Sequence, residues 1–268
     1  MKVLRLGDVG DDVGLLQRRL VRAGYPVAVS HVYDAATEQA IEAVQAKTGL
    51  VVDGITGPKT QSALAIGQRA PKHLADADLV AAAGKLDVAL ACVRAVNEVE
   101  SRGAGYLPDG RPVILFERHI FWKRLKANGI DPAPIAARHP DVLAQTRGGY
   151  KGGAAEYVRM ATAELIHPGA AWESASWGAF QMMGMHWERL GYASIDDFVS
   201  RMEASEAEQL DVFVRFVAAD PKLLAVLRAR KWAQFAAGYN GEDYRANLYD
   251  VKLERAYDRY APKDQVAA

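Results

Sequence analysis

Residues 86–119 read LDVALACVRAVNEVESRGAGYLPDGRPVILFERH and combine a helical pattern with three glutamates, Glu98, Glu100 and Glu117. At about 100° per residue, seven positions share one arc of a helix, with Cys92 and Val99 at its margin: Leu86, Ala89, Leu90, Val93, Val96, Asn97 and Glu100. Glu98 falls outside that arc. The pattern predicts a single core-facing helix that carries Glu100 on its buried side and ends at Ser101-Arg102-Gly103.

Glu100 is the candidate acid of this stretch. Burial disfavours the charged form of a carboxylate, so we expect the pKa of the Glu100 side chain to be raised. A carboxyl group that keeps its proton at neutral pH can act as a general acid at the edge of a cleft. A structural glutamate held by a partner would give the same pattern, and the helical arc alone leaves both interpretations open.

Glu117 is a second acid at the junction of two elements. A turn at residues 108–111 leads into a short β-favouring run, Pro112–Phe116, and a helix follows from about Arg118. Glu117 lies between that strand and that helix. Charged residues at such junctions often cap helices or face solvent, so a structural role is the alternative.

Composition narrows the classes of partner. The 268 residues contain 33 basic and 33 acidic side chains, so the net charge favours neither nucleic acid nor an anionic membrane surface. The one cysteine, Cys92, excludes an intramolecular disulfide and a cysteine-based zinc cluster, and its position suggests a small buried hydrophobe. No run has the length of a membrane span, and residues 1–8 lack the apolar core of a signal peptide. We expect a monomer made in the cytoplasm, with no membrane insertion.

The chain is expected to be mainly α-helical and to form two domains, residues 1–66 and 78–268, joined by a linker over 67–77. In the first domain, apolar spacing predicts helices over 11–23 and 37–47. A turn feeding a helix occurs twice, since residues 34–41 resemble residues 57–64 at an offset of 23. Gly57-Pro58 is a typical helix start.

The second domain reads as helix-dominated, with at most a small sheet around Val113–Phe116. Residues 148–153 (GGYKGG) predict a loop before a helix over 154–166, and residues 172–184 (WESASWGAFQMMG) suit either a sugar-stacking wall or a core helix. Ser194, Ser205 and Asp220 have the spacing of helix N-caps. Disorder is expected only in the tail from Ala261.

Carboxylates are the chemistry that remains after the other motifs are considered. The sequence shows no histidine pair at helical metal spacing, no Gly-x-Ser-x-Gly elbow and no paired cysteines. A protonated glutamate in a cleft lined by aromatic side chains is the pattern of glycoside cleavage, in which an acid protonates the leaving oxygen.

The first domain carries the motifs of a known module: residues 3–7, 13–20 and 23–25, and above all GLVVDGITGPKT at 49–60. With these it resembles the three-helix peptidoglycan-binding module of cell-wall hydrolases. The resemblance implies that the groove around Asp53 and Gly54 binds the cell wall. The chain departs from the family pattern at Ser30–Asp34, where the family usually shows Asp-Gly-x-Phe-Gly. If binding depends on that turn, we expect its affinity or ligand choice to differ here. Tyr33 is the third candidate wall-binding residue, with Asp53 and Gly54.

The second domain carries four further motifs: VESRG at 99–103, LFERH at 115–119, SASWGAFQMMG at 174–184 and YNG at 239–241. It resembles the N-acetylmuramidase domain of modular bacteriophage endolysins, which is lysozyme-like. The resemblance implies Glu100 as proton donor and Glu117 as the base that activates water, with Glu173 as the rival for that second role. It places these residues along the cleft: Tyr150, Glu173, Ser176, Gln181, Tyr239 and Asn240.

The activity implied by both resemblances is hydrolysis of the β-1,4 bond between N-acetylmuramic acid and N-acetylglucosamine, with peptidoglycan glycan strands as the partner and no cofactor or metal. Because Glu100 ends a helix and Glu117 follows a turn and a strand, we expect them to face each other across a cleft, which favours inversion. A lytic transglycosylase of the same fold and a non-catalytic wall-binding virion protein are the alternatives.

Overall fold

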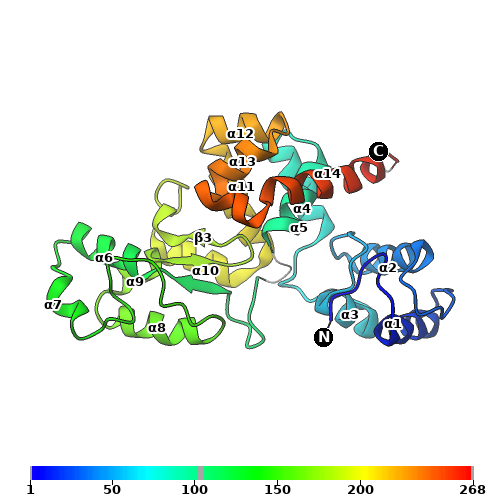
Figure 1. Cartoon of the computed structure of the whole chain (residues 1–268), viewed down its shortest axis with the longest axis horizontal. Coiled ribbons are helices and arrows are strands. Elements are labelled where there is room, and N and C mark those ends of the chain that lie inside the picture. Colours follow the sequence, from blue (N-terminus) through cyan, green and yellow to red (C-terminus); the bar gives the residue numbers. More distant parts are fainter. Residues whose placement is uncertain (1, 102–104, 267–268) are drawn as a thin grey trace. The chain divides into compact units, whose positions relative to one another are not determined.

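The computed structural model describes residues 2–101 and 105–266, and the chain divides into two compact units, Met1–Gly84 and Lys85–Ala268 (Figure 1). Helices dominate both units in the described residues, and the second unit contains a three-stranded sheet. The predicted fold class, mainly α with a small sheet, is confirmed. Within the described part of the chain, no helix is both long enough and apolar enough to span a membrane.

The first unit is built on α1 (Asp11–Arg22), α2 (Ala35–Thr48) and α3 (Pro58–Ile66), followed by α4 (Asp76–Leu86). The apolar positions that predict these helices form its core: Leu4, Val13, Leu16, Leu20, Tyr33, Ile41 and Val44. The Asp34 side chain caps α2 by accepting a hydrogen bond from Thr37 N, and Pro58 begins α3.

The internal repeat of this unit is organised by two buried glutamines. Gln17 on α1 donates from Nε2 to Val32 O and to Thr37 Oγ1, at 2.9 and 3.0 Å. Gln45 on α2 donates in the same way to Ile55 O and to Thr60 Oγ1, at 3.1 and 3.2 Å. Each pair of acceptors is offset by 23 residues, the offset of the predicted repeat. The two turns are therefore copies of one structure.

The segment after α3 folds back on the first unit. Leu50 and Ala75 form an antiparallel bridge, and Val52 N donates to Asp76 Oδ1 at 3.1 Å. The division between the two units falls after Gly84, inside α4. The boundaries at 66 and 78 that the sequence favours remain a prediction.

The predicted helix through Leu86–Glu100 is wrong at its start, because the chain breaks between α4 and α5 (Leu90–Glu100). Asp87 adopts a left-handed conformation with φ 51°, which no continuous α-helix contains. Residues 91–96 of α5 are all buried, so the helix is covered on more than one side. Its C-cap is Ser101, as predicted, while Arg102 and Gly103 lie outside the described residues.

The sheet of the second unit runs β1 (Ile114–Phe116), β2 (Ala175–Trp177), β3 (Met182–Met183), with antiparallel neighbours. One face enters the core through Ile114, Phe116, Ala175, Trp177 and Met182. Because side chains alternate along a strand, the opposite face carries Leu115, Ser176 and Met183. The stretch 172–184 is thus mainly a hairpin and not a core helix.

Helices surround this sheet in the second unit. They are α6 (Arg118–Ala127), α7 (Ala133–Ala136), α8 (Ala155–Glu164), α9 (Pro168–Glu173), α10 (Ile195–Ala204), α11 (Glu206–Ala218), α12 (Pro221–Arg228), α13 (Trp232–Asn240) and α14 (Tyr249–Val266), with 3₁₀ turns η1 (Gly184–His186) and η2 (Glu242–Asn247). Ser194, Ser205 and Asp220 cap α10, α11 and α12 as predicted.

The C-terminal helix corrects one expectation. The tail from Ala261 is not disordered up to Val266, because α14 continues through it. Arg94 Nε on α5 donates to Asp264 Oδ1 at 3.1 Å, which ties this end of α14 to the middle of α5. Figure 1 shows α14 alongside α5 and α13 in the second unit.

Candidate functional site

Glu100 occupies the last turn of α5, where it meets the end of α13. Asn240 Nδ2 donates to Glu100 Oε1 at 2.9 Å. Tyr239 precedes it, and its hydroxyl donates to Phe180 O at 3.0 Å. Burial, and then the charge of Glu100, raise the pKa of Tyr239 well above its usual value, so Tyr239 stays a neutral donor. The structure therefore brings together Glu100, Tyr239 and Asn240, three predicted site residues.

Helix α14 supports α5 from the opposite side. Ala91 and Ala95 of α5 pack against Ala256 and Tyr260 of α14 in one buried cluster. Glu98 accepts a hydrogen bond from Tyr260 Oη at 2.7 Å and pairs with Arg259. Glu98 is therefore a structural anchor between the two helices, not a solvated bystander of Glu100.

Ser176 and Gln181 lie on the β2–β3 hairpin. Ser176 Oγ donates to Gln181 Oε1 at 2.8 Å, and Gln181 Nε2 donates to Gly178 O at 2.8 Å. Gln181 itself has φ 49°, a strained value for a residue with a side chain. The adjacent Phe180 carbonyl is the acceptor of Tyr239, so the hairpin turn touches the Glu100 group through α13.

Glu117 follows β1 and its carboxylate is surrounded by hydrogen-bond donors. Tyr150 Oη lies 2.9 Å from Oε1 and 2.8 Å from Oε2 of Glu117. His119 Nδ1 is 3.1 Å from Oε2, and Arg147 Nη2 is 3.8 Å from Oε1. Burial lowers the pKa of His119, while burial and the bond to Glu117 raise the pKa of Tyr150. Two residues that the sequence analysis names separately, Glu117 and Tyr150, are thus in direct contact.

The pairing of β1 with the hairpin sets how far Glu117 lies from Ser176 and Gln181. Glu117 shares the open face of the sheet with Ser176, since Ser176 pairs with Leu115 two residues earlier. Gln181 Nε2 lies 3.5 Å from Val113 O, at the other end of β1. Val113 and Glu117 are four residues apart, which corresponds to about 13 Å of strand. Glu117 therefore stands at the end of β1 that is remote from Gln181.

Glu173 is held in a separate network. Arg124 Nε donates to its Oε2 at 2.6 Å, and Trp187 Nε1 donates to its Oε1 at 2.8 Å. The side chain is buried at the end of α9, next to the core that Trp172 and Trp187 pack against. Both oxygens thus accept bonds from neighbouring helices and turns, which is the arrangement of a structural ion pair.

No pattern in the sequence singles out Glu156 and Arg159 beyond their i,i+3 spacing, yet they hold the Glu117 region in place. Both are buried, and Arg159 Nη1 lies 2.6 Å from Glu156 Oε2. Glu156 Oε2 accepts from Phe116 N at 3.2 Å, and Arg159 Nη1 donates to Phe116 O at 2.9 Å. Glu156 Oε1 also accepts from Gly152 N, so the pair joins β1 to the loop that carries Tyr150.

In the first unit, Asp53 and Gly54 form the second of the two repeated turns. Asp53 Oδ1 accepts from Gln45 Nε2 at 2.7 Å and from Ile55 N at 2.8 Å. Gly54 has φ 70°, and a side chain there would meet Glu38 at 2.8 Å. Tyr33 is 0 % exposed, and its hydroxyl donates to Gly54 O at 2.7 Å. Tyr33 can therefore influence a ligand only through the shape of this turn.

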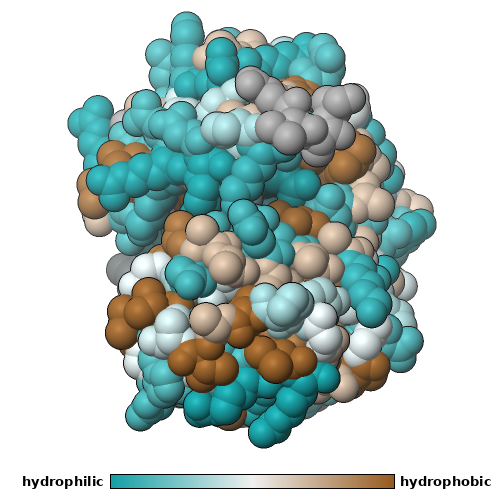
Figure 2. All heavy atoms as spheres, turned by 90° about the vertical axis from the view of Figure 1, so that its right-hand side faces the viewer, coloured by the Kyte–Doolittle hydropathy of each residue, from teal (hydrophilic) through white to brown (hydrophobic). Residues whose placement is uncertain are grey.

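The surface of the first unit also exposes apolar side chains. They include Val3, Leu6, Val9, Leu15, Val29 and Val32. Val9 and Val32 are partners in an antiparallel bridge, so these two exposed valines lie together next to the first repeated turn. Figure 2 shows brown, apolar residues exposed among teal, hydrophilic ones on one face of the molecule.

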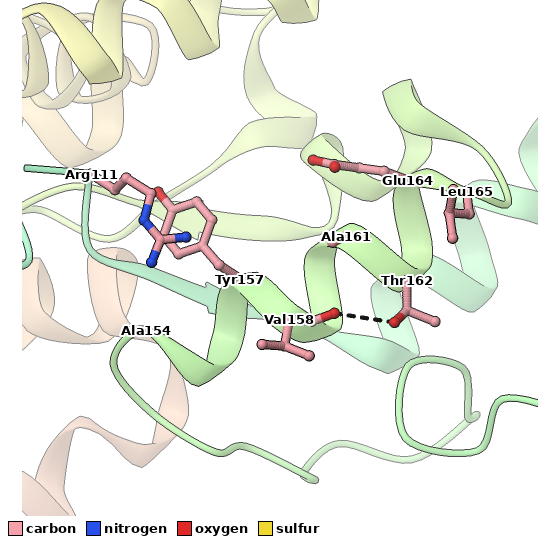
Figure 3. Close-up of a pocket in the computed structure, with 8 residues that line it drawn as sticks. All are labelled: Arg111, Ala154, Tyr157, Val158, Ala161, Thr162, Glu164 and Leu165. Carbon is pink, nitrogen blue, oxygen red and sulfur yellow. Dashed lines mark hydrogen bonds between the residues drawn. The ribbon is translucent and has the colours of Figure 1, made fainter. Parts of the chain in front are cut away.

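A groove of about 830 Å³ lies on the outer side of α8 and contains none of the predicted site residues. It is lined by Arg111, Ala154, Tyr157, Val158, Ala161, Thr162, Glu164 and Leu165 (Figure 3). Its acid, Glu164, accepts a bond from Trp172 Nε1 at 2.6 Å, and the Arg111 guanidinium lies 4.1 Å from the centre of the Tyr157 ring. Among the described residues, no three His, Cys, Asp or Glu side chains converge as metal ligands would.

Comparison with known proteins identifies the second unit. The N-acetylmuramidase family profile matches residues 89–261, which is more than half of the chain. This chain belongs to the N-acetylmuramidase family. The membership confirms the predicted enzyme class, a glycoside hydrolase that acts on peptidoglycan. The matched range contains Glu100, Glu117, the β2–β3 hairpin and the Tyr239-Asn240 pair.

Other relatives of this muramidase support both units. The putative peptidoglycan binding domain profile matches residues 9–64. The crystal structure of a Burkholderia AP3 phage endolysin is 57 % identical, with a TM-score of 0.93 over 97 % of this chain and 100 % of that one. An N-acetylmuramoyl-L-alanine amidase, CwlL of Bacillus licheniformis, is 42 % identical over 74 residues. That match spans 26 % of this chain and only 21 % of the amidase.

Proposed function

We propose that this muramidase is a phage endolysin that hydrolyses the β-1,4 bond between N-acetylmuramic acid and N-acetylglucosamine, with Glu100 as general acid. The observation that carries the proposal is the Asn240–Glu100 hydrogen bond of 2.9 Å at the end of α5, beside Tyr239. The likeness to the AP3 phage endolysin over nearly the whole chain supports the biological role.

Asn240 orients the acid for this reaction. Its amide N–H donates to Oε1 of Glu100, which fixes the orientation of the carboxyl group. Glu100 then protonates the leaving oxygen as the bond to the anomeric carbon breaks. The charge that develops on the sugar ring is stabilised by nearby oxygens, and water attacks the anomeric carbon.

Glu117 is our candidate for the base that activates this water. Tyr150 Oη lies within hydrogen-bond distance of both of its carboxylate oxygens, which fixes the orientation of this side chain. We propose that the two acids stand far enough apart for a water to lie between them, and hence that the reaction inverts at the anomeric carbon. Glu173 is the weaker candidate because Arg124 and Trp187 occupy its carboxylate. Water held by Gln181 and Tyr239 is the remaining alternative.

Wall binding is proposed for the first unit. The peptidoglycan-binding profile covers both repeated turns, and the Asp53-Gly54 turn is the one that retains the family pattern. We propose that this unit binds peptidoglycan, that the protein works as a monomer on periplasmic glycan strands after synthesis in the host cytoplasm, and that it requires no cofactor.

The test is product analysis on purified peptidoglycan, with wild type and Glu100→Gln compared. We expect wild type to release reducing ends, with the α anomer formed first if the reaction inverts, and Glu100→Gln to release none above background. Products ending in 1,6-anhydro sugars would replace hydrolysis by lytic transglycosylation, which needs only one acid. Wall binding without any product from wild type would indicate a non-catalytic virion protein.

A further inference from the structure

Gln209 on α11 is a buried amide between two segments of the muramidase unit. Its side chain is 1 % exposed. Oε1 accepts a hydrogen bond from Ala179 N at 2.8 Å, and Nε2 donates to Met202 O at 2.9 Å and to Gly105 O at 3.4 Å. One side chain thus bonds the backbone of three separate segments.

Two of these segments are parts of the candidate active site. Gly105 comes five residues after Glu100, on the stretch that leaves α5. Ala179 lies in the β2–β3 turn, immediately before Phe180 and Gln181. Phe180 O is the acceptor of Tyr239, whose neighbour Asn240 binds Glu100. Gln209 therefore spans the two ends of a chain of contacts that passes through the acid.

Glu206, one turn earlier on α11, strengthens this connection. Its side chain is buried, and Oε1 accepts from Gly105 N at 2.9 Å. The N–H and the C=O of Gly105 are therefore both held by α11, by Glu206 and Gln209 respectively. These two hydrogen bonds from α11 restrict the movement of the Gly105 backbone.

Two glycines show how closely the amide fits. A side-chain carbon at Gly178 would lie 2.5 Å from Gln209 Cδ, and one at Gly105 would collide with Gln209 Oε1. The amide can occupy this slot in one orientation only. If it were flipped, the NH₂ group would face the Ala179 N–H and the oxygen would face the carbonyls of Met202 and Gly105.

We propose that Gln209 is a positioning residue of the muramidase site, which fixes the β2–β3 turn against the segment that follows Glu100. The inference rests on the proposed function. Gln209 does not touch the reacting atoms in this account. It sets the position of Phe180, and through Tyr239 and Asn240 the orientation of the acid. A displacement of about 1 Å in such a constellation can reduce turnover on the order of 100-fold.

The test is Gln209→Glu, with Glu208→Gln as the matched control on the same helix. A glutamate keeps the acceptor for Ala179 N but loses both donated bonds and places a negative charge against two carbonyl oxygens. Glu208 pairs with the exposed side chain of Arg201 and bonds neither active-site segment through its carboxylate. Each variant is assayed on soluble glycan fragments, with kcat expressed per folded molecule and the melting temperature recorded.

We expect kcat of Gln209→Glu to fall by about 10- to 100-fold with KM changed much less, and Glu208→Gln to match wild type. If Gln209→Glu does not fold, Gly178→Ala displaces the same turn, because its added Cβ would meet the Gln209 amide, and it should show the same loss of kcat. The positioning role would be overturned if Gln209→Glu kept the wild-type kcat per folded molecule. If only Gly178→Ala folds, the same result in that variant would overturn it. Absence of cleavage by wild type would overturn the proposed function itself, a result that these variants cannot imitate.

Discussion

At the scale of single residues, two glutamates two positions apart on α5 have different binding partners. Glu100 binds Asn240 at the end of α13, whereas Glu98 is held by Arg259 and Tyr260 of α14. The helical arc separates them correctly, since Glu98 falls outside the arc that contains Glu100. A position outside the arc is nevertheless not exposed to solvent here, because α14 covers that side of α5.

Glu100→Gln should keep the fold and lose turnover by on the order of 10²–10⁴, because an amide can still accept the Asn240 bond but cannot donate a carboxyl proton. Glu98→Gln should show the opposite pattern, a lower melting temperature with kcat per folded molecule retained. Initial rates on soluble glycan fragments and thermal unfolding of both variants check this. Equal loss of kcat in the two variants would remove Glu100 from its special role.

His186 predicts a pH dependence of stability. Burial, and then the charge of Arg189, lower the pKa of His186, which packs 5.4 Å from the Phe216 ring centre. A histidine with a lowered pKa takes up its proton more readily in the unfolded chain. Above pH of about 6.5, the pKa of a histidine in the unfolded chain, His186 does not change the free energy of unfolding with pH. As the pH falls below that value, the unfolded chain binds the proton more tightly, so the free energy of unfolding falls progressively.

We expect His186→Phe to lose less melting temperature than wild type between pH 7.5 and pH 5, since phenylalanine can keep the stacking and cannot be protonated. Thermal unfolding across that range is the measurement. Identical pH slopes for the two proteins would show that other groups, among them the partly buried His119, account for the acid sensitivity.

At the scale of elements, α14 is the support of the helix that carries the acid. It covers Ala91 and Ala95 and brings Asp264 to Arg94, whose side chain is only 9 % exposed. A buried guanidinium that loses a charged partner destabilises the fold, because the partner offsets part of its desolvation. The C-terminal residues are therefore part of the catalytic unit.

Asp264→Ala should lower the free energy of unfolding by about 1.5–3 kcal/mol, the value of a hydrogen bond to a charged group. Asp258→Ala, at an exposed position on the same helix, should change it by less than about 0.5 kcal/mol. Denaturant unfolding of both variants provides the comparison. A neutral Asp264→Ala would mean that solvent replaces the carboxylate at no cost.

At the scale of the whole molecule, two units with separate cores predict separable functions. Removal of the first unit should spare cleavage of soluble fragments and weaken attack on intact walls, because a tethered binding unit raises the local concentration of substrate. Two truncations sharpen this test. One begins after Ile66, where the sequence places the end of the first domain, and the other after Gly84, where the structure divides the units.

We expect both truncations to cleave soluble fragments at the wild-type rate, and both to clear outer-membrane-permeabilised cells more slowly in a turbidity assay. The protein that begins after Gly84 should be the more stable of the two. The one that begins after Ile66 keeps Ala75 and Asp76 but lacks their partners Leu50 and Val52. Loss of fragment cleavage in both would show that the two units act as one cooperative structure.

The sequence by itself determined the class of fold, the enzyme class and the helix caps at Ser194, Ser205 and Asp220. Apolar spacing, Ser and Asp caps and Gly-Pro starts are local signals, so they act within one or two helical turns and can be read from neighbouring residues. The isolated glutamates and the absence of other reactive motifs likewise pointed to carboxylate chemistry. The internal repeat with an offset of 23 residues predicted two equivalent turns. It did not predict that Gln17 and Gln45 form the hydrogen bonds that organise these turns.

Only the tertiary structure decided which residues meet. The break at Asp87, the pairing of β1 with the hairpin, the Glu98 anchor and the Asn240–Glu100 bond each depend on partners far away in the chain. So do the buried contacts of Glu173 with Arg124, of Glu156 with Phe116 and of Gln209 with Ala179. A side-chain bond that joins residues 30 to 162 positions apart leaves no periodic trace in either segment, because its geometry is set by how helices pack and not by local propensity.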